Sequence, residues 1–285
     1  MIHVATVHWR SERWIDPQLR YLERFLPGPF RAYAFLNRVP GDHRGKFFYT
    51  STERIQDHAT KLNLLADVIS YAADDPADLL VFVDGDAFPV APVGPVVDER
   101  LERHRLIAVQ RRENNRDVQP HPCFCVTTVG FWQEIRGDWH RGHQWPDPEG
   151  VPVTDVGANL LAALEREGVD WYPLRRVNAA DLHPLFFGLY GDAGHGPLVY
   201  HHGAGFRESA GGRVTRMAHG ERRVRKSPLS RAVSRLPKKG PLGAVRRRLN
   251  RARRLRDGLR EETRRLSDEV LAQLEADDEF WRRFA

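Results

Sequence analysis

Short apolar runs rich in β-branched and aromatic residues recur along the first 200 residues of the chain, and they predict strands. The clearest run is Leu79 to Val83, which is continuously apolar. Such runs are typical of strands buried on both faces, as in parallel sheets covered by helices. Further runs predict strands over residues 2–7, 30–36, 106–110, 122–129 and 197–202, and a strand or an edge segment over 169–174.

Between these strands, apolar residues recur at helical spacing. One helix is expected after Pro17. A second begins at Asp57 or at Thr60 and leads directly into the strand that starts at Leu79, which gives β-α-β order. Thr154 is expected to cap a helix over residues 155–167, because threonine is a good N-cap. The alternation of strands and helices predicts an α/β fold.

Composition and charge divide the chain of 285 residues into two parts. Hydrophobic content is 41% and charged content 29%, which indicates a folded globular protein. Residues 222–256 contain 15 Lys or Arg and no acid. Because the net charge is +6, the remaining residues together carry −9. We therefore expect a domain over residues 1–220 and a basic, mostly helical extension over residues 221–285.

The cellular location is predicted from what the sequence does not contain. No apolar run approaches the length that crosses a bilayer, and Met1 to Val7 is too short for a signal peptide. Cys123 and Cys125 lie two residues apart, too close for a useful disulfide. These features predict a cytoplasmic protein with reduced cysteines, which could also be peripheral at the inner face of the membrane.

The candidate chemistry lies at the end of the clearest strand, where Asp84-Gly85-Asp86 follows the apolar run. In open α/β sheets, ligands bind just beyond the carboxyl ends of the strands. Two acids at that position, with a glycine that lets a ligand approach the backbone, predict a site for a hard divalent cation and the phosphates it carries. A solvated turn with two acids is the structural alternative.

An apolar strand that ends in Asp84-Gly85-Asp86 resembles the D-x-D site of GT-A-fold glycosyltransferases, which use nucleotide-diphosphate sugars. The resemblance covers about residues 1 to 210. It implies a GT-A-like open, mostly parallel twisted sheet flanked by helices. It also implies metal-dependent transfer of a sugar from a nucleotide-diphosphate donor to an acceptor, for example a cell-envelope glycan or a lipid-linked molecule.

The resemblance implies that the loop after the first strand receives the donor nucleotide. Thr6, His8 and Trp9 are therefore expected to contact the nucleotide. Trp9 either stacks on the base or packs on the following helix. Lys61 lies with His58 in the first turn of a predicted helix, where a cation opposes the helix dipole. We therefore assign Lys61 to the diphosphate or the ribose, with an ordinary surface lysine as the alternative.

The metal is expected to be Mn²⁺ or Mg²⁺, with Asp86 as the best ligand and Asp84 on the metal or the ribose. In many members of the resembled family, a histidine after the last strand completes the metal shell. Here His201 and His202 are adjacent, and alternation along a strand puts them on opposite faces. One of them is expected to be a ligand, and His202 is preferred. An imidazole with two carboxylates suits Mn²⁺ better than Mg²⁺.

Two further residues are assigned on the resemblance. Asp155 is expected to face the sugar, and it is the candidate base in an inverting reaction. Its structural alternative is a favourable charge at a helix N-terminus. Arg207 follows two glycines near the last strand and is expected to pair with phosphate. Residues 137–153 are rich in Gly, Pro, Trp and His, and they are expected to form an acceptor lid or a disordered coil.

Other functions fit parts of the sequence. Phosphatases of the haloacid-dehalogenase type also have a strand that ends in D-x-D, but they usually carry Thr or Val where Phe88 stands here. The basic segment 222–256 is compatible with binding to nucleic acid or to an anionic membrane. Nucleic acid is the less expected partner, because the segment lacks interleaved aromatic residues.

Overall fold

The structure is a computed structural model that describes residues 1–114, 116–147, 150–183, 185–203, 228–237, 239–249 and 251–285. Within these residues the chain forms two compact units. The first comprises residues 1–181, 187–203 and 281–285, and the second comprises residues 182–186 and 228–280. The predicted boundary near residue 220 lies outside the described residues.

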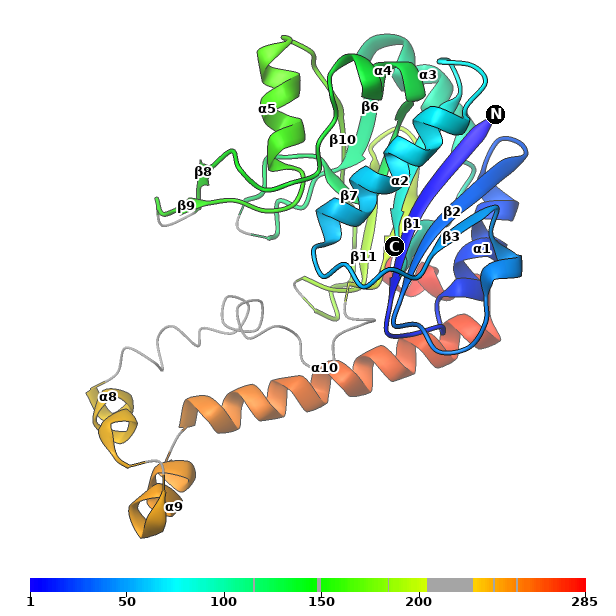
Figure 1. Ribbon diagram of the computed structural model, residues 1–285. Helices are drawn as coiled ribbons and strands as arrows, with labels where there is room; N and C mark the ends of the chain where they lie inside the picture. The colour runs from blue at the N-terminus through cyan, green and yellow to red at the C-terminus, as the bar shows by residue number, and fades with distance from the viewer. Residues whose placement is uncertain (115, 148–149, 184, 204–227, 238, 250) are drawn as a thin grey trace. The chain divides into compact units, whose positions relative to one another are not determined.

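The first unit is built on a ten-stranded sheet (Figure 1). Its strands, in spatial order, are β3 (Tyr49–Ser51), β2 (Phe30–Asn37), β1 (Ile2–Trp9), β4 (Leu79–Asp84), β7 (His121–Thr128), β6 (Leu106–Val109), β10 (Tyr172–Arg176), β11 (Gly188–Asp192), β12 (Gly196–His201) and β5 (Ala87–Pro89). Two short strands, β8 (Trp145–Pro146) and β9 (Pro152–Val153), pair separately.

The sheet is parallel across β3, β2, β1 and β4, and again between β6 and β10. It is antiparallel where β7 lies between β4 and β6, and along β10, β11, β12 and β5. Helices flank the sheet, and the predicted α/β class is confirmed. The antiparallel direction of β7 was not predicted, and it decides which residues reach the carboxyl end of β4.

Alternation along β4 divides the core between the two faces of the sheet. Leu80 and Phe82 pack with residues of α2 (His58–Ala72), α4 (Val129–Glu134) and α5 (Ala158–Arg166). Val81 and Val83 pack with residues of α1 (Ile15–Phe25) and α3 (Gly94–His104) on the other face (Figure 1). The continuous apolar run of the sequence is thus explained by burial on both faces.

The structure shows where two of the predicted helices begin. Asp57 rather than Thr60 begins the second helix, because its carboxylate accepts a hydrogen bond from Thr60 N at 2.8 Å. The predicted start at residue 155 is wrong, since α5 begins at Ala158 after Gly157 at φ 92°. The Thr154 hydroxyl instead accepts from Gly142 N at 3.1 Å. A Cβ at Gly157 would lie 2.0 Å from the Pro120 carbonyl oxygen, so only glycine fits there.

The last five residues belong to the first unit. Phe284 is fully buried, and its ring stacks 5.9 Å from that of Tyr200 in β12. Its carbonyl oxygen accepts a hydrogen bond from Ala179 N at 2.8 Å. The end of the chain therefore covers the strand that leads to His201.

The second unit is mainly helical. The second unit contains α8 (Pro228–Arg235), α9 (Gly240–Leu249) and α10 (Arg251–Ala276). A short 3₁₀ helix, Phe280–Phe284, follows at the boundary with the first unit. None of the helices in the described ranges combines the length and the apolar character that a membrane span requires.

Candidate metal centre and its surroundings

The candidate centre forms where three segments meet at the carboxyl end of β4. Asp84 is the last residue of β4, and the turn through Gly85 and Asp86 leads into β5. β12 pairs with β5 so that His201 lies opposite Ala87. This register brings a histidine from late in the chain to the two aspartates.

The side chains of Asp84, Asp86 and His201 converge. His201 Nε2 lies 3.7 Å from Asp84 Oδ2 and 3.5 Å from Asp86 Oδ1. One potential ligand atom from each residue lies within 4.8 Å of the others, which is compatible with a shared metal ion. Asp86 and His201 are 4% and 5% exposed, so water screens the group only weakly.

Both carboxyl groups are held in the charged form. Burial acts to raise the pKa of Asp84, but His58 Nε2 at 2.9 Å from Oδ1 outweighs it, and the net pKa lies well below the ordinary value. The pKa of Asp86 is also lowered, because the contact with His201 outweighs the burial. Two ionised carboxylates this close, one buried and one partly buried, repel each other unless a cation lies between them.

The structure corrects the choice between the two histidines. As predicted, they point to opposite faces, but His201 is the one that joins the carboxylates. His202 is fully buried, with Nδ1 2.8 Å from the Tyr200 hydroxyl and its ring 4.5 Å from the ring of Trp14. The preference for His202 as a metal ligand is therefore wrong, because its ring faces the core.

Thr6 and His8 also face the core, which contradicts their assignment to the nucleotide. Both are fully buried, and the Thr6 hydroxyl donates to Gln18 Oε1 at 2.9 Å. Gln18 Nε2 in turn donates to the carbonyl oxygens of Asp84 at 2.7 Å and Ala87 at 2.8 Å. Gln18, which the sequence analysis did not single out, thus holds the backbone on both sides of the Asp-Gly-Asp turn.

Glycine is required at position 85 for a different reason from the one predicted. A Cβ there would lie 2.6 Å from the carbonyl oxygen of Val7 and 2.8 Å from His8 Nδ1. The missing side chain therefore makes room for β1 rather than for a ligand. His8 fills the space beneath the turn, and its burial lowers its pKa to about 4, so the ring is neutral.

Trp9 and Lys61 lie together beside the carboxylates. Trp9 is partly buried, and Lys61 Nζ lies 4.5 Å from the centroid of its ring. Lys61 is 1% exposed, so the alternative of an ordinary surface lysine is wrong. Burial lowers its pKa to about 8, while Asp57 and Asp84 act to raise it. One face of Trp9 packs on Lys61 of α2, and stacking of a base on Trp9 stays a prediction.

Asp155 is not one of the three residues that converge. Asp155 Oδ1 accepts hydrogen bonds from Val156 N at 2.9 Å and from Arg141 Nη2 at 3.1 Å. It lies on the segment that precedes α5, and its role as a base stays a prediction. Arg207 lies outside the described residues.

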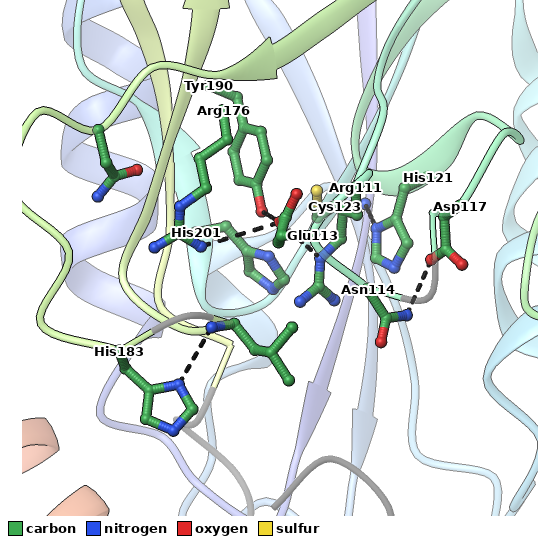
Figure 2. A network of polar contacts seen from close by, with 12 residues as sticks. Arg111, Glu113, Asn114, Asp117, His121, Cys123, Arg176, His183, Tyr190 and His201 are labelled. Carbon is green, nitrogen blue, oxygen red and sulfur yellow. Dashed lines mark hydrogen bonds and ion pairs between the residues drawn. The ribbon is translucent and has the colours of Figure 1, made fainter. Parts of the chain in front are cut away.

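A second polar cluster lies beside His201 and was missed by the sequence analysis (Figure 2). The Tyr190 hydroxyl donates to Glu113 Oε1 at 2.6 Å. The same oxygen lies 3.6 Å from Arg111 Nε and 3.9 Å from Arg176 Nη1. The sequence marks residues 111–119 only as a charged loop. Antiparallel pairing of β7 with β4 brings this loop to the Asp-Gly-Asp turn. The cluster could have been predicted only if the direction of β7 had been known.

Two other groups of this loop region are buried. Asp117 is 1% exposed, and burial raises its pKa to about 7. Asn114 Nδ2 donates to Asp117 Oδ2 at 2.8 Å. His121, the first residue of β7, has its ring centroid 6.0 Å from that of His201. Arginine and histidine side chains, together with Glu113 and Asp117, therefore surround the two aspartates on this side.

The predicted lid segment, residues 137–153, is tied to α2. Asp138 accepts hydrogen bonds from Asn63 Nδ2 at 2.6 Å and from Asn159 Nδ2 at 2.7 Å. His140 Nδ1 lies 2.7 Å from Asp138 Oδ1, and its Nε2 lies 3.0 Å from the Thr60 hydroxyl. The start of the segment is therefore anchored near the helix turn that carries Lys61, and its role as an acceptor lid stays a prediction.

No family model and no curated protein matches the chain. Solved structures similar to it include residues 1–349 of TarS from S. aureus, with 12% identity and a TM-score of 0.40 over 81% of this chain and 68% of that one. The same TarS fragment in complex with UDP-GlcNAc is similar with 12% identity and a TM-score of 0.33, over 65% and 62%. The glycosyltransferase GlyE from Streptococcus pneumoniae is similar with 10% identity and a TM-score of 0.35, over 61% and 45%.

The chain covers only part of each of these structures. It spans 30% of the length of another TarS structure that it matches. These identities and TM-scores are too low to assign an activity.

Proposed function

We propose that this chain is a metal-dependent glycosyltransferase that moves a sugar from a nucleotide-diphosphate donor to an acceptor hydroxyl. The observation that carries the proposal is the convergence of Asp84, Asp86 and His201 at the carboxyl end of β4. That edge of an α/β sheet is where ligands bind. A divalent cation at these three side chains would hold the phosphates of the donor.

The donor set fits Mn²⁺. Two carboxylate oxygens and one imidazole nitrogen match the ligand types that Mn²⁺ accepts, whereas Mg²⁺ prefers oxygen ligands. Two ionised carboxylates, one buried and one partly buried, also gain from a cation between them. Such an ion supplies electrostatic stabilisation of the negative charge that develops on the leaving diphosphate.

Lys61 is the proposed contact to the donor phosphates. Its ammonium group is buried beside Trp9, and within the described ranges no carboxylate forms an ion pair with it. A buried cation without an ion pair is costly, and an anionic ligand would offset that cost. The half-exposed side of Trp9 is proposed to stack on the nucleobase.

Asp155 is proposed as the carboxylate that takes the proton of the acceptor hydroxyl in an inverting reaction. Its contact with Arg141 ties it to residues 137–153, which are the proposed acceptor lid. A cell-envelope glycan or a lipid-linked molecule is the proposed class of acceptor.

The basic segment 222–256 is proposed to bind anionic lipid. Its described residues belong to α8, α9 and the start of α10, and 15 positive charges without an acid favour a surface of opposite sign. Co-sedimentation with phosphatidylserine vesicles, lost at high salt, is expected. Equal salt-sensitive retention on double-stranded DNA would contradict a membrane-specific role.

The test of the proposed activity is a thermal shift screen of nucleotide sugars, including UDP-GlcNAc, with and without Mn²⁺. A ligand that binds only the folded protein raises the melting temperature. We expect a rise that needs both Mn²⁺ and a nucleotide sugar, and that is absent in Asp86→Asn but kept in Asp67→Asn on the exposed side of α2. Phosphatase activity on p-nitrophenyl phosphate, without binding of any nucleotide sugar, would contradict the proposal.

A further inference from the structure

His121 reaches the metal centre because β7 runs antiparallel to β4. The pairing of Leu79 with Thr128 and of Val83 with Phe124 places the beginning of β7 beside the end of β4. His121 is the first residue of β7, and its ring centroid lies 6.0 Å from that of His201. In the view of Figure 2, the guanidinium group of Arg111 lies between the two rings.

The backbone fixes which nitrogen of His121 carries the proton. Cys123 N donates a hydrogen bond to His121 Nδ1 at 3.1 Å (Figure 2). A peptide N–H can only donate, so Nδ1 must present its lone pair, and the neutral ring then carries its proton on Nε2. His121 is 8% exposed, so this hydrogen bond is largely shielded from water. The ring is therefore a neutral hydrogen-bond donor through Nε2.

This tautomer excludes the most obvious alternative, in which His121 is a fourth metal ligand. Coordination through Nε2 requires a lone pair on that atom, and here the atom carries a proton. Within the described part of the chain, no residue accepts a hydrogen bond from Nε2. Nε2 keeps some access to solvent, so a bound ligand can reach it and provide the acceptor.

The position of the donor defines the chemistry of that ligand. Asp84 and Asp86 are acceptors only and could hold a cation, whereas His121 is a donor on the strand that adjoins β4. A group that touches both the cation and His121 must offer oxygens that coordinate a metal and accept a hydrogen bond. A phosphate has this property, since several of its oxygens accept hydrogen bonds at once.

We propose that His121 Nε2–H donates a hydrogen bond to a phosphate oxygen of the ligand that Asp84, Asp86 and His201 hold through their cation. This inference rests on the proposed function, because it takes the ligand to be a metal-bound diphosphate. It makes His121 a residue that recognises the ligand, distinct from the residues that bind the metal.

The test uses two substitutions that each keep one half of the imidazole. His121→Asn keeps an acceptor near the position of Nδ1 for Cys123 N–H and removes the outer donor. His121→Gln keeps an amide donor near the position of Nε2. Calorimetric titration of the Mn²⁺–pyrophosphate complex into Mn²⁺-saturated full-length protein is the measurement, and electron paramagnetic resonance of free Mn²⁺ gives the metal affinity separately.

We expect His121→Asn to bind Mn²⁺ as the wild type does and to bind Mn²⁺–pyrophosphate at least about tenfold more weakly. This is the loss expected for one hydrogen bond to a charged group. His121→Gln should recover most of the affinity for pyrophosphate. Equal pyrophosphate affinity in wild type and His121→Asn would overturn the inference, and so would an equal loss in both variants, which indicates a structural role.

A direct measurement of the tautomer does not depend on folding of the variants. The ¹⁵N shifts of the His121 ring in labelled wild-type protein should show a protonated Nε2 and a bare Nδ1, and the opposite pattern would overturn the inference. The same experiments distinguish failure of the proposed function from failure of this inference. If the three proteins bind Mn²⁺–pyrophosphate with the expected affinities but no nucleotide sugar binds, the transferase function is rejected and the role of His121 stands. Absence of pyrophosphate binding in the wild type would reject both.

Discussion

The Nε2 atom of His58 lies 2.9 Å from Asp84 Oδ1, so the first turn of α2 is joined to the first carboxylate of the Asp-Gly-Asp turn. The other oxygen of Asp84 faces His201. The Asp84 side chain is therefore oriented by His58 of α2 on one side and by His201 of β12 on the other. Because Lys61 lies one turn after His58, the same helix turn positions the proposed phosphate contact relative to the carboxylates.

The first prediction separates the two adjacent histidines. His201→Ala should raise the Mn²⁺ concentration needed for donor binding by at least about tenfold, because it removes one of three ligands. His202→Ala should lower the melting temperature without a specific change in the Mn²⁺ titration, since its ring packs on Trp14 and its Nδ1 contacts Tyr200. Mn²⁺ titrations monitored by electron paramagnetic resonance provide the measurement. Equal shifts in both variants would contradict the assignment.

The second prediction concerns the pH dependence of Lys61. Its pKa falls from an ordinary 10.5 to about 8 in the folded protein. The ammonium that attracts phosphate is therefore lost as the pH rises through about 8, and affinity for Mn²⁺–UDP should fall from about pH 7 to about pH 9. Lys61→Arg should keep its affinity to higher pH, because arginine stays protonated. A wild-type affinity that is constant over this range would contradict the proposed contact.

Folding stability should show the opposite trend for this residue. Between pH 8 and 10.5 the unfolded chain binds more protons at Lys61 than the folded protein does, so the contribution of Lys61 to the free energy of unfolding rises with pH. Lys61→Met should therefore flatten the dependence of the melting temperature on pH in this window. Lys46→Met, at an exposed position, should leave it unchanged.

The third prediction concerns Gly85. Gly85→Ala should lower the free energy of unfolding by about 1–3 kcal/mol, the usual cost of overpacking, because its Cβ would lie 2.6 Å from a backbone oxygen of β1. Urea denaturation measures the change. Gly45→Ala is the matched control, since no atom lies within 4 Å of a Cβ there. If both alanines had the same small effect, close packing of the turn on β1 would be excluded.

The fourth prediction concerns the end of the chain. Phe284→Ala should destabilise the protein by about 3–5 kcal/mol, as expected for a buried aromatic residue. Phe48→Ala should have a much smaller effect, because Phe48 is 58% exposed. Denaturant unfolding followed by tryptophan fluorescence provides the comparison. A Phe284→Ala variant as stable as the wild type would show that the last residues do not complete the core of the first unit.

Much of the sheet could be predicted, because its central strands are marked locally. The run from Leu79 to Val83 and the cap at Asp57 each carry their own signal in a few residues. The edge strands β3 and β5 are three residues long, and the apolar pattern is too short to reveal them. The start of α5 was misplaced because a tertiary contact, that of Thr154 with Gly142, competes with the cap.

The candidate site was predicted only in part, because local sequence patterns do not reveal how distant strands pair. Alternation showed that His201 and His202 face opposite sides, but no local pattern says which side holds the carboxylates; the pairing of β12 with β5 decides it. Thr6 was assigned to the site although its hydroxyl is committed to Gln18. His121 and Arg111 were missed because their approach depends on the direction of β7, a property of the whole sheet.

The reversed direction of β7 separates two parts of the site that can change independently over evolutionary time. The Asp-Gly-Asp turn is bound to β1 and Gln18 through the core, so few substitutions are tolerated there. Residues 110–120 enter the site from a loop that precedes β7, and the central strands do not depend on the length of that loop. A lineage of such proteins can therefore acquire a new ligand preference by altering this loop while it inherits the metal-binding turn unchanged.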